Sequence, residues 1–216
     1  MSASTAVTLV RHGQTPWHHG NRYTGSSDIS IDDVGREQAQ ALAAWARRVR
    51  PDGLYASTML RAQQTAAPVA AALGLDVRTD ERLRELDFGA AEGRTLNELR
   101  ATDPVAVAAF LADAADGHLP GGEHPASAAD RAHAALAEIV DRHRGENILV
   151  VCHNTLIRLI VCRAVRIPLG TYRTALRGIA PTAATQLSYR DDGTVTLEYY
   201  NRLPEPGGEA RDARPV

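Results

Sequence analysis

The stretch that most constrains this 216-residue chain is a short apolar run near its start that ends abruptly in polar residues. Residues 7–10 are β-branched or leucine, the pattern of a buried strand in a parallel sheet. The run stops at Arg11, His12 and Gly13, so a cation, an imidazole and a glycine follow the strand directly. In open α/β sheets, ligands bind beyond the carboxyl ends of the strands. The stretch therefore predicts a ligand site just past this strand.

Two later strands are expected to bring charged or titratable residues to the same edge of the sheet. Residues 147–152 form the most strand-like run of the chain, and this run also ends at a histidine, His153. Residues 54–57 form a shorter strand, followed by a helix that carries Arg61 in its first turn. The backbone N–H groups of a helix start attract anions, and the arginine adds its charge to them. These patterns favour an anion site shared by several strand ends.

Strands that alternate with helical patterns indicate an α/β fold, here a three-layer, doubly wound and mostly parallel sheet with helices on both faces. The other segments expected to be regular are helices at 35–50, 59–73, 96–115, 126–144 and 155–165, a short strand at 76–78, and a closing hairpin of 185–189 with 194–200. Pro68 is expected to kink or split its helix, and Asp103-Pro104 to start a new one. Residues 1–203 are expected to form one domain with a small helical cap insertion at about 93–128, and 204–216 a disordered tail.

Charge and composition exclude several classes of function. The net charge is −2, which does not favour binding to nucleic acid or to acidic membranes. All 24 basic residues are arginines, so lysine chemistry such as a Schiff base or a P-loop is excluded. Cys152 and Cys162 match no metal spacing, and we expect them to be small buried residues in a reducing cytoplasm. No stretch is long and apolar enough to span a membrane.

Four motifs now occur in one order along the chain. They are Arg11-His12-Gly13, Arg61 within residues 57–66, Glu85 within residues 83–89, and His153-Asn154 after the strand at 147–152. Together they resemble the histidine phosphatase superfamily, which includes phosphoglycerate mutases and many small phosphatases. The resemblance spans residues 7 to about 200, nearly the whole chain.

The resemblance implies a role for each of these residues. His12 is the expected nucleophile that takes the phosphoryl group, and Arg11, Arg61 and His153 are expected to clamp its oxygens. Glu85 is expected to protonate the leaving alkoxide and then to deprotonate the attacking water. The residues expected to bind the phosphate are Arg11, His18, Arg61, His153, Thr24 and Gly25. No cofactor and no metal are implied, because two guanidiniums and an imidazole already supply positive charge.

The chain departs from the family pattern at three places near this site. His18 stands where many relatives have an asparagine that lines the phosphate pocket, and Asn154 where glycine or alanine is usual. Gln14 replaces a common glutamate, which is a mild change. A metal site built from His12, His18, His153 and Glu85 is the alternative reading of the same residues. It is disfavoured because adjacent arginines would repel the cation and no zinc-type spacing is present.

The resemblance covers hydrolases and mutases, and the fold does not choose between them. Mutases of the family carry a basic insertion that closes over the substrate, whereas residues 93–120 here hold only Arg94 and Arg100 as cations. We therefore expect a metal-independent, cytoplasmic phosphatase of small phosphorylated metabolites, with no nucleic-acid or membrane partner. A cofactor-dependent phosphoglycerate mutase, a phosphoprotein phosphatase and a non-catalytic phosphoester-binding module remain alternatives, and a homodimer is left open.

Overall fold

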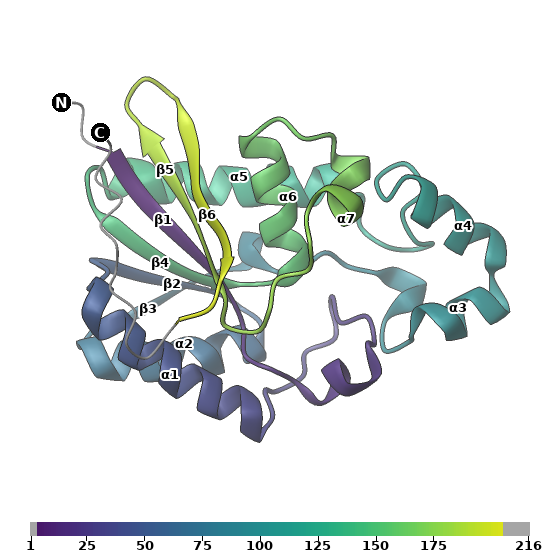
Figure 1. The fold of residues 1–216 in the computed structure, drawn as a ribbon, viewed down its shortest axis with the longest axis horizontal. Helices are drawn as coiled ribbons and strands as arrows, with labels where there is room; N and C mark the ends of the chain where they lie inside the picture. The colour runs from purple at the N-terminus through teal and green to yellow at the C-terminus, as the bar shows by residue number, and fades with distance from the viewer. Residues whose placement is uncertain (1–3, 205–216) are drawn as a thin grey trace.

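The fold is built on one six-stranded sheet (Figure 1). It is seen in a computed structural model that describes residues 4–204, so nearly all of the tail expected at 204–216 lies outside the described residues. The strand order is β3-β2-β4-β1-β5-β6. The strands are β1 (Ser4–Arg11), β2 (Gly53–Ser57), β3 (Val77–Asp80), β4 (Asn147–Cys152), β5 (Ala184–Arg190) and β6 (Val195–Arg202).

The sheet is parallel over four strands and antiparallel at one edge. β1 pairs with β4 in parallel, and β2 pairs in parallel with both β3 and β4. β5 runs antiparallel to β1, and β6 returns antiparallel to β5 as the expected hairpin. The predicted mostly parallel, doubly wound sheet is therefore confirmed, with an antiparallel ribbon added at its end.

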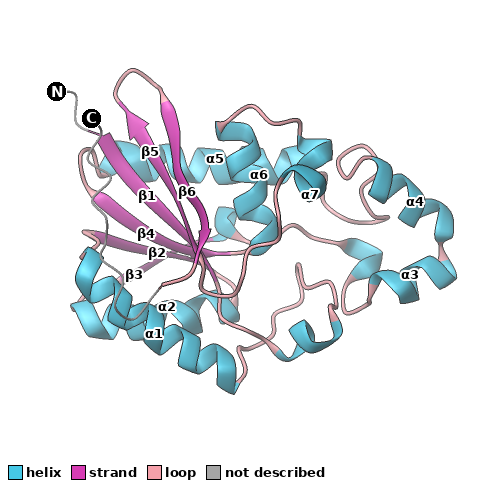
Figure 2. Cartoon of the chain, viewed as in Figure 1, coloured by secondary structure: helices cyan, strands magenta, loops and turns pink. Residues whose placement is uncertain are grey.

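Helices cover both faces of the sheet (Figure 2). α1 and α2 pack together on one face, and α5 and α6 pack together on the other. Two further helices, α3 and α4, lie to the side of the sheet, beyond the carboxyl ends of its parallel strands. The bounds are α1 (Asp33–Val49), α2 (Leu60–Leu73), α3 (Leu96–Thr102), α4 (Pro104–Ala112), α5 (Pro125–Arg142), α6 (Asn154–Ala164) and α7 (Tyr172–Ala175).

Alternate residues of the central strands build two separate apolar layers, as a period of two requires. In β4, Ile148, Val150 and Cys152 belong to the layer on the side of α5 and α6. Leu149 and Val151 belong to the layer on the side of α1 and α2. Because both faces are buried, β4 reads as an unbroken apolar run, which explains why it is the clearest strand in the sequence.

Two helix boundaries test the expectations for proline. The α3–α4 break falls at Asp103, whose side chain accepts the N–H of Ala106 at 2.9 Å and caps α4 just before Pro104. Of the two outcomes expected at Pro68, the split is wrong, because α2 runs through it as one helix, and the kink stays a prediction. Packing of the α2 face that carries Ala62, Ala66 and Val69 into the sheet layer outweighs the loss of one backbone hydrogen bond.

The remaining expectations concern small features. Cys152 and Cys162 are free and fully buried, as predicted. The short helix α7 was not predicted; it lies between α6 and β5. Within residues 4–204, no helix has the length and apolar character that crossing a membrane would need.

Candidate active site

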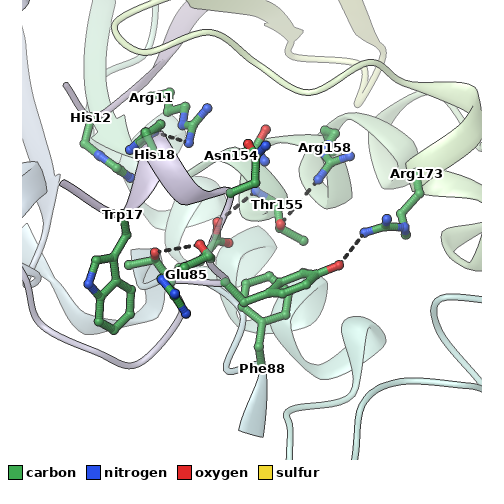
Figure 3. Close-up of a pocket in the computed structure, with 14 residues that line it drawn as sticks. Arg11, His12, Trp17, His18, Glu85, Phe88, Asn154, Thr155, Arg158 and Arg173 are labelled. Atoms are coloured by element: carbon green, nitrogen blue, oxygen red, sulfur yellow. Dashed lines mark hydrogen bonds between the residues drawn. The ribbon is translucent and has the colours of Figure 1, made fainter. Parts of the chain in front are cut away.

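A cleft of about 250 Å³ opens at the carboxyl ends of β1 and β4, next to α6 and α7 (Figure 3). Pockets for small molecules typically run from about 300 to 1,000 Å³, so this cleft lies just below that range. The lining residues come from six parts of the chain: Arg11, His12, Trp17, His18, Asn21, Arg22, Tyr23, Thr24, Glu85, Phe88, Asn154, Thr155, Arg158 and Arg173.

Strand pairing brings the two motif histidines together. Arg11 of β1 lies opposite Cys152 of β4, and the N–H of His12 donates to the carbonyl of Cys152 at 3.0 Å. His12 and His153 therefore leave neighbouring strands at the same level, and their ring centroids lie 5.2 Å apart. The expectation that both imidazoles meet at one edge of the sheet holds.

The imidazole of His12 is buried and fixed in one orientation. Its Nδ1 lies 2.7 Å from the carbonyl of Gly13, which can only accept, so Nδ1 carries the proton and Nε2 keeps its lone pair. Burial first, and then the charges of Arg61, His153 and Arg11, hold the pKa of His12 well below its usual range. At neutral pH the ring is therefore uncharged, the form in which an imidazole is a nucleophile.

His153 is fully buried, and neither of its ring nitrogens has a hydrogen-bond partner within the described chain. Burial, followed by the charge of Arg61, lowers the pKa of this ring as well. Buried polar groups are nearly always paired, and an unpaired one costs free energy. His153 is not among the residues that line the cleft, but its ring lies 5.2 Å from the ring of His12, which does line it.

Arg61 is completely buried at the start of α2, as its place in the first turn predicts. Its two terminal nitrogens donate to backbone carbonyls of Ser27 at 2.8 Å, Gly25 at 2.9 Å and Thr24 at 3.3 Å. Only Nε lacks a partner among the described residues. Arg61 therefore stands behind the lining of the cleft, and its charge is the largest charge effect on the pKa of both His12 and His153.

Arg11 and His18 meet on the wall of the cleft. Arg11 can only donate, so Nε2 of His18 accepts from a terminal nitrogen of Arg11 at 2.5 Å. In the neutral ring the proton is then on Nδ1, which lies 2.9 Å from the hydroxyl of Thr15. This contact fixes the orientation of the Arg11 guanidinium at the cleft. Burial and the Arg11 charge lower the pKa of His18 to about 4.

Glu85 lies in the cleft with its carboxylate held against the start of α6. Oε1 accepts the N–H groups of Leu86 and Leu156, each at 2.9 Å, and Oε2 accepts that of Thr155 at 2.9 Å. The side chain of Arg131 also fixes the Glu85 backbone, donating to its carbonyl at 3.1 Å. Oε2 takes a single hydrogen bond, so it keeps a lone pair that can carry a proton.

Of the two loop residues expected to bind phosphate, only Thr24 lines the cleft. The N–H of Gly25 donates to the carboxylate of Glu92 at 2.9 Å and is not free for a ligand. A β-carbon at Gly25 would lie 2.2 Å from the carbonyl of Leu86. Gly25 therefore serves close packing of the loop, and its expected contact with phosphate is corrected.

The sequence reasoning missed two arginines of the cleft. Arg158 lies one helical turn after Asn154 on α6, and this spacing of four residues was the available signal. Arg173 lies on the unpredicted helix α7, and a four-residue helix shows no periodicity to detect. Asn154 itself lines the cleft, and its Oδ1 accepts the N–H of Ile179 at 2.8 Å. Within the described residues, no group of three or more histidine, cysteine or acidic side chains is placed to hold a metal ion.

An α/β sheet whose strand ends gather two neutral histidines, two arginines and one carboxylate defines a protein built to handle a small anion. The particular family follows from sequence comparison: the profile of the histidine phosphatase superfamily (branch 1) matches residues 7–202. The chain belongs to that superfamily.

Relatives with names and solved structures agree with this assignment. Phosphoglycerate mutase-like protein 4 of Arabidopsis thaliana is 37% identical over 161 residues, 73% of this chain and 70% of its own length. The probable phosphoglycerate mutase GpmB of Salmonella paratyphi C is 34% identical over 162 residues, 75% of each chain. The structure of a mycobacterial glucosyl-3-phosphoglycerate phosphatase superposes with a TM-score of 0.84 at 29% identity, covering 92% of this chain and 99% of that one. The alpha-ribazole phosphatase of Shigella flexneri gives 0.81 at 25% identity, covering 94% and 99%.

Proposed function

We propose that this protein is a phosphomonoester hydrolase that acts on small phosphorylated metabolites through a phosphohistidine on His12, with Glu85 as general acid and base. The observation that carries the proposal is the state of His12, a neutral ring with Nδ1 bonded to the Gly13 carbonyl and Nε2 free. The cations Arg11 and Arg61 and the unpaired His153 surround this ring. Each supplies what a phosphoryl group with three charged oxygens requires.

In the first step, the lone pair of His12 Nε2 forms a bond to phosphorus, and the bond from phosphorus to the ester oxygen breaks. The electron pair of that bond goes to the departing alkoxide, a poor leaving group. Glu85, protonated on Oε2, gives its proton to the alkoxide, and such general acid catalysis typically contributes about 10²–10⁴-fold. Arg11 and His153 donate to the phosphoryl oxygens, His18 holds the Arg11 guanidinium in place by accepting from it, and Arg61 adds its charge from behind.

In the second step, the Glu85 carboxylate takes a proton from water as the water oxygen attacks phosphorus. The bond between phosphorus and Nε2 breaks, its electron pair returns to the imidazole, and inorganic phosphate leaves. The Gly13 carbonyl accepts from Nδ1 in both steps and so keeps the ring in one tautomer. No step draws on a metal ion, because the arginines supply the charge that a metal would.

The relatives support hydrolysis in particular. Structural neighbours named as phosphatases cover nearly the whole chain. One of them, the mycobacterial glucosyl-3-phosphoglycerate phosphatase, has been solved with inorganic phosphate and with VO3. The curated relatives carry mutase names, so the mutase remains the second candidate. Hydrolysis is favoured because Arg94, one of the two cations in residues 93–120, already donates to Thr102 and to the carbonyl of Glu98.

The covalent intermediate is the test. With phosphorus-labelled p-nitrophenyl phosphate and a rapid denaturing quench, we expect a protein-bound label that is stable to base and labile to acid. His12→Ala should abolish the label and lower turnover by at least about 10³-fold, whereas the exposed His19→Ala should keep both. Turnover in His12→Ala above roughly a thousandth of wild type would refute the covalent mechanism.

The same assay separates the alternatives. Phosphate release should be unaffected by EDTA, and a loss that zinc or magnesium restores would refute metal independence. A mutase would interconvert phosphoglycerates when primed with a bisphosphate and release little phosphate. Binding of phosphoesters without any turnover would instead indicate a non-catalytic module.

A further inference from the structure

We propose that Arg158 and Arg173 form a second anion subsite in the cleft. The substrate would then be a phosphomonoester that carries another oxyanion, a carboxylate or a second phosphate. This inference rests on the proposed function, because it assumes that the reacting phosphoryl group lies at His12. Neither arginine has a part in the two chemical steps described above.

Arg158 carries a buried charge that nothing in the described chain neutralises. The residue is only 7% exposed, and no carboxylate of residues 4–204 lies within ion-pairing distance of it. Its one hydrogen bond goes to the hydroxyl of Thr155 at 3.4 Å, and its Nε has no partner there. A buried guanidinium is costly unless it is paired, so this residue needs an anion that the described residues do not supply.

Aromatic rings hold both guanidiniums in place. The Arg158 guanidinium lies 4.8 Å from the ring centroid of Tyr172, and that of Arg173 lies 4.5 Å from the ring centroid of Phe110. Arg173 also donates to the Tyr23 hydroxyl at 3.2 Å. A ring that fixes a guanidinium reduces the conformational entropy lost when the guanidinium binds an oxyanion. The paired N–H groups of the planar guanidinium match two oxygens of a carboxylate or a phosphate.

The two arginines lie in the same cleft as the phosphoryl site but away from His12. Figure 3 shows them across the cleft from His12, beyond Thr155, with Glu85 between the two groups. The charge of Arg158 nevertheless reaches Arg11. The pKa of Arg11 is lowered to about 10 by burial and by the charges of Arg158 and Arg61. A substrate whose leaving oxygen lies near Glu85 would therefore extend its other end toward Arg158 and Arg173.

The balance of charge around the cleft leads to the same conclusion. Four arginines line it, against one carboxylate, Glu85. One of the four, Arg22, is already paired with Glu98 at 2.9 Å. A bound phosphoryl dianion offsets the charges of Arg11, at the end of β1, and of the buried Arg61 on α2. Arg158 and Arg173 then remain without a counter-charge, which a second oxyanion on the substrate would supply.

The test compares substrates that differ only in the second anion. For the carboxylate, 3-phosphoglycerate is paired with glycerol 3-phosphate, which has a hydroxymethyl group in its place. For the phosphate, fructose 1,6-bisphosphate is paired with fructose 6-phosphate. Phosphate release gives kcat and KM for each, and p-nitrophenyl phosphate reports the reaction itself. We expect the doubly anionic member of at least one pair to have a kcat/KM about 10- to 100-fold higher.

Variants of Arg173 then assign the preference. Arg173→Gln should remove most of this preference by raising KM for the doubly anionic ester, with a much smaller effect on the hydrolysis of p-nitrophenyl phosphate. Arg173→Lys keeps the charge and should restore part of the preference. Arg177→Gln is the matched control, because Arg177 is an exposed arginine four residues further on, outside the cleft. Circular dichroism and thermal melting should show that each variant is folded.

The possible failures are distinguishable. If p-nitrophenyl phosphate is hydrolysed but both members of each pair react equally, the subsite is refuted and the hydrolase stands. The subsite is also refuted if Arg173→Gln lowers kcat/KM by the same factor for both members of a pair. If the wild type hydrolyses none of these esters and forms no phosphoenzyme, the proposed function is refuted, and the subsite with it.

Discussion

Two of the three histidines of the site have their proton placed by a neighbour. The Gly13 carbonyl puts the proton of His12 on Nδ1, and the Arg11 guanidinium, which donates to Nε2 of His18, leaves the proton of His18 on Nδ1. His153 has no such partner within the described chain, so its tautomer is free to follow a ligand.

The carboxyl of Glu85 gives the prediction at this scale. Glu85→Gln removes the proton that we propose Glu85 transfers but keeps a side chain of the same shape, whose amide oxygen can still accept the N–H of Leu156 at the start of α6. We expect alkyl phosphates to lose about 10²–10⁴-fold in kcat/KM. p-Nitrophenyl phosphate, whose leaving group needs little protonation, should lose far less in the first step. The measurement is a series of esters with graded leaving-group acidity.

A neighbouring acid provides the control for that series. Asp87→Asn removes a carboxyl two residues further on that does not line the cleft. In this variant, kcat/KM should depend on the acidity of the leaving group as it does in the wild type. If Glu85→Gln lowers kcat/KM equally for alkyl and aryl esters, another residue must protonate the leaving group.

At the scale of elements, the turn after β1 is positioned by contact with the start of α1. A β-carbon on Gly13 would lie 2.7 Å from the Gly35 carbonyl, closer than such contacts occur. The Gly13 N–H also donates to the Thr65 hydroxyl of α2 at 2.9 Å. Strand β1 therefore contacts two helices, α1 and α2, at the residue after His12.

Gly13→Ala should disturb these contacts between β1 and the two helices. Backbone cannot yield as a flexible side chain can, so we expect a loss of about 1–3 kcal/mol in the free energy of unfolding. A drop in kcat should accompany it, because the Gly13 carbonyl that fixes His12 must move. Gly20→Ala is the control, since its new β-carbon meets only the Arg22 side chain at 3.5 Å. Denaturant titration measures the free energy of unfolding, and steady-state kinetics measure kcat. A Gly13→Ala variant with both values as in the wild type would contradict the prediction.

At the scale of the whole molecule, the sequence predicted most of the fold and the histidine pair but not the full extent of the cleft. Residues 147–152 were predicted without error because a doubly buried strand is apolar throughout. Arg173 was not found, because α7 is too short for a periodic pattern and only tertiary packing brings it to Tyr23. Gly25 was assigned to phosphate because a sequence motif does not tell a packing glycine from a binding one.

Burial of neutral histidines makes the stability of the fold depend on pH. Burial lowers the pKa of His12, His153 and His18, the last to about 4, whereas an unfolded histidine titrates near about 6.5. Between these values the unfolded chain binds more protons, so the free energy of unfolding falls as the pH falls below about 6.5. Each such ring contributes up to about 1.4 kcal/mol per pH unit.

Replacing one of these rings should reduce the pH dependence. His18→Asn removes one titrating group and should make the fall in unfolding free energy between pH 6.5 and 4.5 less steep. His19→Asn, a change at an exposed ring, should leave the slope unchanged. Urea titrations across this range measure the slope, and identical slopes in wild type and His18→Asn would contradict the assignment of a neutral buried His18.

The unpaired ring of His153 and the two arginine charges beside His12 have a kinetic consequence. These groups interact with the oxygens of inorganic phosphate as well as with those of an ester. The enzyme should therefore retain its own product, with phosphate as a competitive inhibitor and its dissociation as a slow stage of the cycle. A catalyst of this design would slow down as phosphate accumulates and recover when another process removes it.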